Sequence, residues 1–172
     1  MLAAAVLMAL GKILSMDEIY RSVEWRSIFL VAGLLPLGLA MTQTGAAAFL
    51  ADGIIGFVGP AGPYALLAGL VVFTALITQA MSSQAVGAVV APIAIQAAHQ
   101  VNADPRAMAM GVALATSLAF VTPVSHPVNI LVMGAGGYRF RDYLRVGLPL
   151  AVIVLAIILA LMPVFWPLTP RA

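Results

Sequence analysis

The longest uncharged stretch of the sequence sets the strongest limit on the fold. From Gly53 to Ala103 there is no Asp, Glu, Lys or Arg. One α-helix over the 35 residues of Tyr64–Ala98 would be about 52 Å long, whereas the hydrocarbon core of a bilayer is about 30 Å thick. Two full spans with a turn would need more residues than this. The length therefore predicts one helix over Tyr64–Thr78, followed by a re-entrant helical hairpin with its polar tip near Ser82–Gly87.

The composition indicates a membrane environment for the whole chain. Of its 172 residues, 63% are hydrophobic and 8% are charged, against about 25% charged residues in soluble domains. We therefore predict an integral, multi-pass protein of the plasma membrane, with the lipid bilayer as a partner. The net charge of +2 comes from few acidic residues and not from a basic patch, so nucleic-acid binding has no support. The chain has no cysteine, which excludes disulfides and thiolate metal sites within it.

A second polar break lies further along the chain. The pair Asp104-Pro105 predicts a helix start, with the aspartate as N-cap and the proline at the first helical position. This helix is predicted to run to Val121. It then meets Pro123 and Pro127, which remove backbone donors and disfavour helix at the residues before them. Helical structure is predicted to resume briefly over Val128–Met133.

The remaining elements follow from apolar runs between charged or Gly/Pro-rich segments. They are a helix at Leu2–Ser15, a helix at Ser27–Met41, an interfacial helix at Gly45–Val58, a turn at Gly59–Pro63, a polar loop at Tyr138–Arg145, and a last helix at Tyr143–Met162 capped by Asp142. The predicted fold is all-α, with about five transmembrane helices plus a re-entrant helical hairpin and one broken helix. We divide the chain into scaffold-like helices in residues 1–63 and a transport-like unit in residues 64–172. Lys12 follows only a short apolar start, so we expect a fragment that begins inside a helix.

Both breaks carry a recognisable pattern. The first reads Thr78-Gln79-Ala80-Met81-Ser82-Ser83-Gln84, and the second reads Phe120-Val121-Thr122-Pro123-Val124-Ser125-His126-Pro127-Val128-Asn129. Over about Glu24–Val164 the sequence resembles the C-terminal half of the divalent anion–sodium symporters, a family of citrate-transporter-like permeases. The resemblance implies one of two inverted repeats, with the substrate between two hairpin tips at mid-membrane. A missing N-terminal half or a second copy is then an expected partner, and the complete protein is expected to be a homodimer.

The resemblance also implies site residues. The substrate-binding candidates are Ser82, Ser83, Gln84, Ser125, His126, Pro127 and Asn129. The ion-coupling candidates are Thr78, Ser83, Ser125 and His126, and no metal site is expected. Where the family has Ser-Asn-Thr, this tip has Ser82-Ser83-Gln84. The identity of the anion, and the choice between Na⁺ and H⁺ as coupling ion, therefore stay open.

Two physical interpretations of these side chains compete. Free N–H groups at the N-termini of half-helices favour an anion, and hydroxyl and carbonyl oxygens can coordinate Na⁺. Alternatively, Ser and Thr hydroxyls bond the backbone of their own helix or tie helices together. His126 is an ionisable group at predicted membrane depth, which indicates function, and imidazole changes charge close to neutral pH, which would permit proton coupling. Alternatively, the His126 ring is neutral and bonded to a neighbouring carbonyl. The other histidine, His99, is expected at the membrane interface.

The first functional hypothesis is therefore half of a secondary active transporter. It would move a small anion, such as a di- or tricarboxylate or sulfate, by ion coupling. We expect no enzymatic activity and no cofactor other than Na⁺ or H⁺ as the coupling ion. A cation/proton antiporter of the same broad fold and a non-transporting, channel-like or structural membrane subunit are the alternatives.

Overall fold

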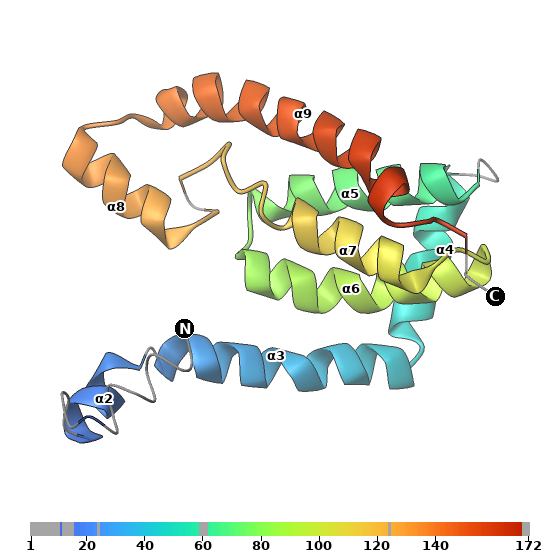
Figure 1. Cartoon of the computed structure of the whole chain (residues 1–172), viewed down its shortest axis with the longest axis horizontal. Coiled ribbons are helices and arrows are strands. Elements are labelled where there is room, and N and C mark those ends of the chain that lie inside the picture. The colour runs from blue at the N-terminus through green and yellow to red at the C-terminus, as the bar shows by residue number, and fades with distance from the viewer. Residues whose placement is uncertain (1–10, 12–15, 24, 59–61, 124, 170–172) are drawn as a thin grey trace. The chain divides into compact units, whose positions relative to one another are not determined.

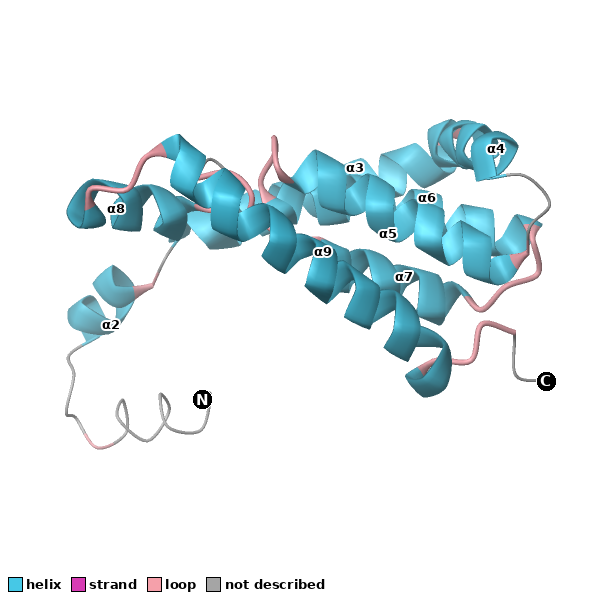
Figure 2. Cartoon of the chain, turned by 90° about the horizontal axis from the view of Figure 1, so that it is seen from above, coloured by secondary structure: helices cyan, strands magenta, loops and turns pink. Residues whose placement is uncertain are grey.

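The computed structural model describes residues 11, 16–23, 25–58, 62–123 and 125–169. These residues form helices and connecting turns, and none of them lies in a β-strand (Figure 1, Figure 2). The helices are α2 (Met16–Ser22), α3 (Trp25–Gln43), α4 (Ala46–Val58), α5 (Pro63–Thr78), α6 (Ser83–Gln100), α7 (Pro105–Ala115), α8 (Pro127–Gly136) and α9 (Phe140–Phe165). The all-α prediction is confirmed for this part of the chain. The predicted helix at Leu2–Ser15 and most of the turn at Gly59–Pro63 fall outside the described residues.

The chain falls into two compact units, Met1–Gly33 and Leu34–Ala172. In the first unit, Trp25 stacks on Tyr20 with 5.7 Å between ring centroids, and its indole N–H donates to the Tyr20 carbonyl over 2.9 Å. This contact joins α2 to the start of α3. In the second unit, α4 packs on α5 and α6. The predicted division after residue 63 thus separates helices that pack together, and it stays a prediction about function.

Helices α5, α6 and α7 form the centre of the second unit. α4 packs against α5 and α6, and α9 packs against α5 and α7 (Figure 1). The buried side chains are mostly small or β-branched, with a few larger ones: Ala47, Ala51, Leu67, Leu70, Val71, Val86, Val90, Ala94, Ala97, Ala98, Met108, Val112, Ala115 and Met162. Small side chains let helix backbones approach each other closely, as in membrane helix bundles.

α5 and α6 together make the predicted hairpin, but its tip comes earlier than predicted. α5 ends at Thr78, the chain turns over residues 79–82, and α6 begins at Ser83. The prediction of a tip near Ser82–Gly87 was therefore wrong for residues 83–87. The reason is that Ser82 is an N-cap, whose Oγ accepts from the Ala85 amide over 3.4 Å and starts the helix at once. The first arm of the hairpin is α5 itself and not a separate segment after it.

The helix before the second break is shorter than predicted. Asp104 is its N-cap, as predicted, but α7 ends at Ala115 and does not reach Val121. After this end, the amides of Ser117 and Leu118 donate to carbonyls only three residues back, each over 3.1 Å. Such tightened turns end a helix and leave the following backbone groups without helical partners. The break therefore begins well before the prolines from which it was predicted.

α8 and α9 are both longer than predicted. α8 extends beyond the predicted Val128–Met133, and α9 extends beyond the predicted Tyr143–Met162 at both ends. The predicted polar loop at Tyr138–Arg145 was wrong from residue 140 onward, because these residues open α9. Asp142 is not the N-cap but lies in the first turn, where its Oδ2 accepts from the Arg139 amide over 2.8 Å. A carboxylate that reaches back in this way stabilises the start of a helix from inside it.

Within the described residues, α9 is the one helix that is long and apolar enough to cross a membrane by itself. Its 26 residues give a length of about 39 Å. α5 is apolar but shorter, and the segments Ala32–Gln43 and Ala46–Phe57 of α3 and α4 pass the same test only as a pair bent by 73°. The number of about five spans therefore stays a prediction.

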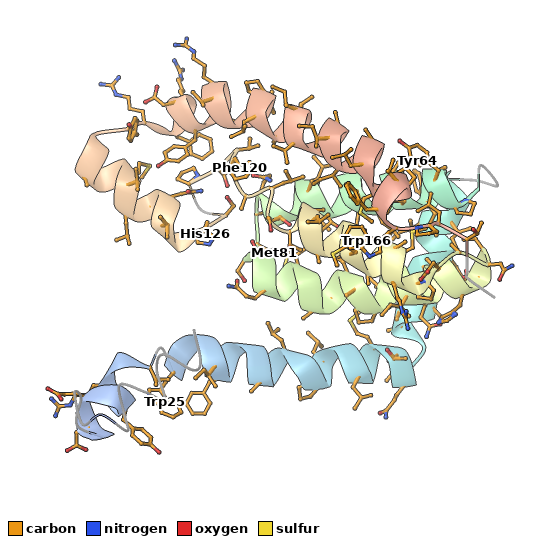
Figure 3. All side chains as sticks on the ribbon, in the orientation of Figure 1. Trp25, Tyr64, Met81, Phe120, His126 and Trp166 are labelled. Atoms are coloured by element: carbon orange, nitrogen blue, oxygen red, sulfur yellow. The ribbon has the colours of Figure 1, made fainter. Side chains whose placement is uncertain are left out.

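Polar contacts tie the bundle together at the end away from the hairpin tip. Pro163 lies inside α9 and leaves the Leu159 carbonyl without its helical donor. The Tyr64 hydroxyl of α5 donates to that carbonyl over 3.3 Å (Figure 3 labels Tyr64). At the same end, the Gln100 amide of α6 donates to Asp52 of α4 over 2.8 Å.

Gly147 is the point where α9 meets the second break. It is buried, and a Cβ added to it would overlap the Phe120 carbonyl and lie 3.0 Å from the Val121 Cα. Only glycine allows the two backbones to approach this closely. The break is thereby fixed near the N-terminal end of α9.

Replacing Gly147 tests this contact. We expect Gly147→Ala to lower stability by about 1–3 kcal/mol, because the new methyl group forces the two backbones apart. Thermal unfolding of the detergent-purified full-length protein measures the effect. Gly134→Ala in α8 is the matched control, since a Cβ there meets nothing within 4 Å. An unfolding midpoint equal to that of the wild type in Gly147→Ala would contradict the contact.

Candidate functional site

The two breaks lie against each other. Met81 at the hairpin tip, Phe120 in the second break and His126 at the start of α8 are grouped at one end of the α5–α7 bundle (Figure 3). The Thr122 hydroxyl donates to the Gln79 backbone carbonyl over 2.7 Å, which joins residues 43 apart in the chain. The structure thus brings together the two breaks that the sequence indicated.

Gln79 makes most of the contacts between the breaks, and the sequence analysis did not count it among the site residues. Its Nε2 donates to the Leu118 carbonyl over 2.6 Å and to the Ala75 carbonyl of its own helix over 2.9 Å. Its Oε1 accepts from the Val121 amide over 3.1 Å. One half-buried side chain therefore pairs two backbone groups of the second break. The sequence signal that could have identified Gln79 is the position of its side-chain amide directly after an uncharged helix, because an amide both donates and accepts.

Ser83 forms a second link between the breaks. Its Oγ donates to the Thr116 carbonyl over 2.7 Å, at the C-cap of α7. Ser83 lies in the first turn of α6 and is half-buried. With its hydrogen used in this bond, the hydroxyl can offer only its oxygen lone pairs to a ligand.

The second break is closed largely by its own polar side chains. Ser125 is buried, and its Oγ lies 2.7 Å from the Thr122 carbonyl and 3.0 Å from the Ala119 carbonyl. The Asn129 amide also donates to the Ala119 carbonyl, over 3.0 Å. From α9, the Tyr143 hydroxyl donates to the backbone carbonyl of Asn129 over 2.7 Å. The Asn129 Oδ1 accepts no hydrogen bond from the described residues, so it is available to a ligand.

His126 and Pro127 start α8. His126 is the N-cap, and its Nδ1 accepts from the Val128 amide over 3.3 Å. Pro127 occupies the first helical position, where its missing N–H costs nothing. Because Nδ1 is an acceptor here, the hydrogen of a neutral ring is assigned to Nε2. The His126 side chain is exposed, so Nε2 is accessible. In the structure the imidazole ring is bonded to the Val128 amide, whereas the alternative interpretation placed it on a neighbouring carbonyl.

The other predicted residues differ in exposure. Thr78 is fully buried, and its hydroxyl donates to the Thr74 carbonyl over 2.7 Å, the within-helix bond weighed as an alternative. Ser82 is exposed at the N-cap of α6. Gln84 is also exposed, and its amide makes no hydrogen bond to the described part of the chain. The described residues therefore do not use the donors of Ser82 and Gln84.

The hydrogen bond between Gln79 and Thr122 lies shortly before the starts of α6 and α8 in the sequence. Ser83 follows Gln79 by four residues and His126 follows Thr122 by four residues, and Gln79 and Thr122 are bonded to each other. Residues 78–85 and 116–129 contain no Lys, Arg, Asp or Glu. The electrostatics of the site therefore come from backbone dipoles. Helix N-termini attract anions and the freed carbonyls of helix C-termini attract cations.

An open cavity of about 400 Å³ adjoins this arrangement between the break, α8 and α9. It borders the site at Asn129 and is otherwise lined by Phe120, Val132, Tyr138, Asp142, Tyr143, Val146, Gly147 and Leu150. Its wall is mainly apolar and aromatic, as is usual for pockets that bind small molecules.

The chain is similar to known transporters over most of its length. The model of the citrate transporter family (CitMHS) matches residues 1–113. The chain is 38% identical over 164 residues to the uncharacterized transporter YfbS of Escherichia coli (strain K12), covering 95% of the chain and 27% of that protein. It is 39% identical over 152 residues to the uncharacterized transporter sll0640 of Synechocystis sp., covering 88% of the chain and 25% of that protein. It is 31% identical over 149 residues to sodium/sulfate cotransporter 1 of Chlamydomonas reinhardtii, covering 86% of the chain and 17% of that protein.

These matches cover most of the chain and are not confined to the two breaks. The family model covers the hairpin, and the alignments with single relatives cover most of the chain. The chain spans between 17% and 27% of the length of these three relatives. All three are named as transporters, in line with the expectation that the chain is not an enzyme. The chain therefore belongs to the citrate transporter family of membrane transport proteins.

Proposed function

We propose that the complete protein is a secondary active transporter of the plasma membrane that couples the movement of a small anion to Na⁺ or H⁺. The observation that carries the proposal is the pair of breaks, which are joined through Gln79 and Ser83 and lead directly into the starts of α6 and α8. The chain covers about a quarter of the length of YfbS, so it supplies one side of the site. The other side comes from the missing N-terminal half or a second copy, in a multi-pass protein that we expect to be a homodimer.

The exposed part of the site suits an anion. Ser82 and Gln84 at the start of α6, and His126 at the start of α8, have donors that the described residues do not use. The N-termini of α6 and α8 each add partial positive charge. Neutral donors of this kind bind a sulfate or carboxylate without the strong affinity that would prevent its release.

The inner part of the site suits a cation. The hydroxyls of Thr78, Ser83 and Ser125 all donate to backbone carbonyls, so they can offer only oxygen lone pairs. The Asn129 Oδ1 and the second lone pairs of the Thr116 and Leu118 carbonyls are further oxygen ligands. A hard cation such as Na⁺ prefers oxygen ligands. This division agrees with Thr78, Ser83 and Ser125 as ion-coupling residues.

A substrate panel tests the proposal. One relative is named a sodium/sulfate cotransporter, so sulfate with Na⁺ is the first pair to test, followed by succinate and citrate. We expect full-length protein in proteoliposomes to accumulate at least one of these labelled anions when a Na⁺ or H⁺ gradient is imposed. Accumulation should stop when the gradient is collapsed. No accumulation of any of the three under either gradient would overturn the proposal.

Ser83→Ala tests whether the tip belongs to the site. The change removes the donor to the Thr116 carbonyl and an oxygen ligand for the cation, and we expect uptake to fall roughly tenfold or more. Ser117→Ala is the matched control, because the exposed Ser117 side chain makes no hydrogen bond to the described residues. Uptake is compared at equal amounts of protein in the membrane. Equal uptake by the two variants would remove Ser83 from the site.

His126→Asn tests proton coupling. Asparagine retains an acceptor for the Val128 amide and is a good N-cap, but it cannot be protonated near neutral pH. We expect the variant to insert normally and to show uptake that no longer varies between about pH 5.5 and 8. His99→Asn is the matched control, since His99 lies at the other end of α6. A pH profile unchanged from the wild type in His126→Asn would exclude His126 as the coupling group.

A further inference from the structure

Backbone groups of the second break are paired by a residue that belongs to the hairpin and not to the break. Residues between the end of α7 and the start of α8 have backbone groups without helical partners. The Leu118 carbonyl and the Val121 amide are two of these groups, and both are paired by the Gln79 side chain of the hairpin. The Thr122 hydroxyl adds a bond to the Gln79 carbonyl. One residue of the hairpin thus meets the break at three points.

We propose that Gln79 is a positioning residue for transport, which keeps the second break in the shape that the ion and the solute require. The proposal rests on the proposed function of the site. Gln79 lies beside the predicted ligands and makes its bonds to backbone groups, so it acts through the carbonyls that it orients. If the hairpin and the break move during transport, these bonds make them move together.

The amide is the chemical feature that this role needs. Nε2 donates to the Leu118 and Ala75 carbonyls, while Oε1 accepts from the Val121 amide. Leucine has a similar size but can pair none of these groups. A carboxylate can accept but not donate, and it would face two carbonyl oxygens. A neutral carboxylic acid donates once and accepts once, so it can bond both Leu118 and Val121.

Gln79→Glu therefore converts the contact into one that depends on pH. At low pH the introduced carboxyl group is neutral and can replace the amide at the break. At high pH it is ionised, its donor is lost, and the carbonyls repel it. Uptake by this variant should be close to normal at low pH and should fall as the pH rises. Gln79→Leu should be inactive throughout.

Other titratable groups near the break need a control. On the elements packed around it, these groups are His126, Tyr138, Arg139, Arg141, Asp142, Tyr143 and Arg145. Tyr64, His99, Asp104 and Arg106 lie at the far ends of their helices, and Asp52 lies in the middle of α4, where it is bonded to Gln100. None of them forms a hydrogen bond or an ion pair with Gln79. Because His126 is exposed and is itself tested for proton coupling, the uptake of each Gln79 variant is divided by that of the wild type at the same pH.

The experiment measures gradient-driven uptake of the transported anion at pH 5.5 and pH 8. We expect Gln79→Glu to lose roughly tenfold more uptake than the wild type between these two values, reversibly on return to low pH. Equal uptake by Gln79→Glu and the wild type at both values would overturn the proposal. Substantial uptake by Gln79→Leu would overturn it as well.

Hydrogen exchange gives a readout that does not depend on transport. In the full-length protein carrying Gln79→Leu, peptides covering residues 118–125 should lose protection, because the Val121 amide has lost its acceptor, while peptides of α7 keep theirs. Unchanged protection in residues 118–125 would overturn the proposal even if the wild type transports none of the tested anions. If Gln79→Leu does not fold, the same comparison is made with Gln79→Glu at low and high pH, corrected with the wild type at each pH.

Discussion

The constraint on which this structure depends is that the backbone groups freed at the two breaks of an apolar helix bundle need partners inside the protein. An unpaired amide or carbonyl in hydrocarbon costs several kcal/mol, so a helix can be broken there only if side chains replace its lost bonds. Gln79, Ser125 and Asn129 do this for the carbonyls of Leu118, Ala119 and Thr122. The polar residues at the two breaks are thus explained first by backbone pairing. Only the donors and acceptors that this pairing leaves unused are available to a solute.

The same rule accounts for the other irregular points of the bundle. Pro163 frees the Leu159 carbonyl inside α9, and the Tyr64 hydroxyl bonds to it from α5. Gly147 allows the backbone of the break to lie directly against α9. Pro163 is thus matched by a contact from another helix, and Gly147 by a contact with the second break. The irregular backbone is therefore held from two sides, by the hairpin and by α9.

Sequence patterns located the two breaks but not their limits or their contacts. Length alone indicated a re-entrant hairpin after a helix over Tyr64–Thr78, and Pro123 and Pro127 indicated the broken helix. The limits shifted because side chains cap helices from neighbouring positions, as Ser82 and Asp142 do. The role of Gln79 was not predictable, because its partners are 39 and 42 residues away. Which carbonyls are free depends on where α7 ends, and the sequence contains no local signal for that end.

Hydrogen bonding also constrains which ligand each side chain can take. A hydroxyl whose hydrogen is directed to a backbone carbonyl presents only oxygen to a ligand, so Ser83 and Ser125 are suited to a cation and poorly suited to an anion. Gln84 makes no bond to the described residues and keeps both N–H donors. The residues of the tip are therefore not equivalent, although they are adjacent in sequence. We therefore propose that, within Ser82-Ser83-Gln84, the middle residue faces the ion and the outer two face the anion, and we expect changes at Gln84 to alter anion selectivity with the least disturbance of the fold.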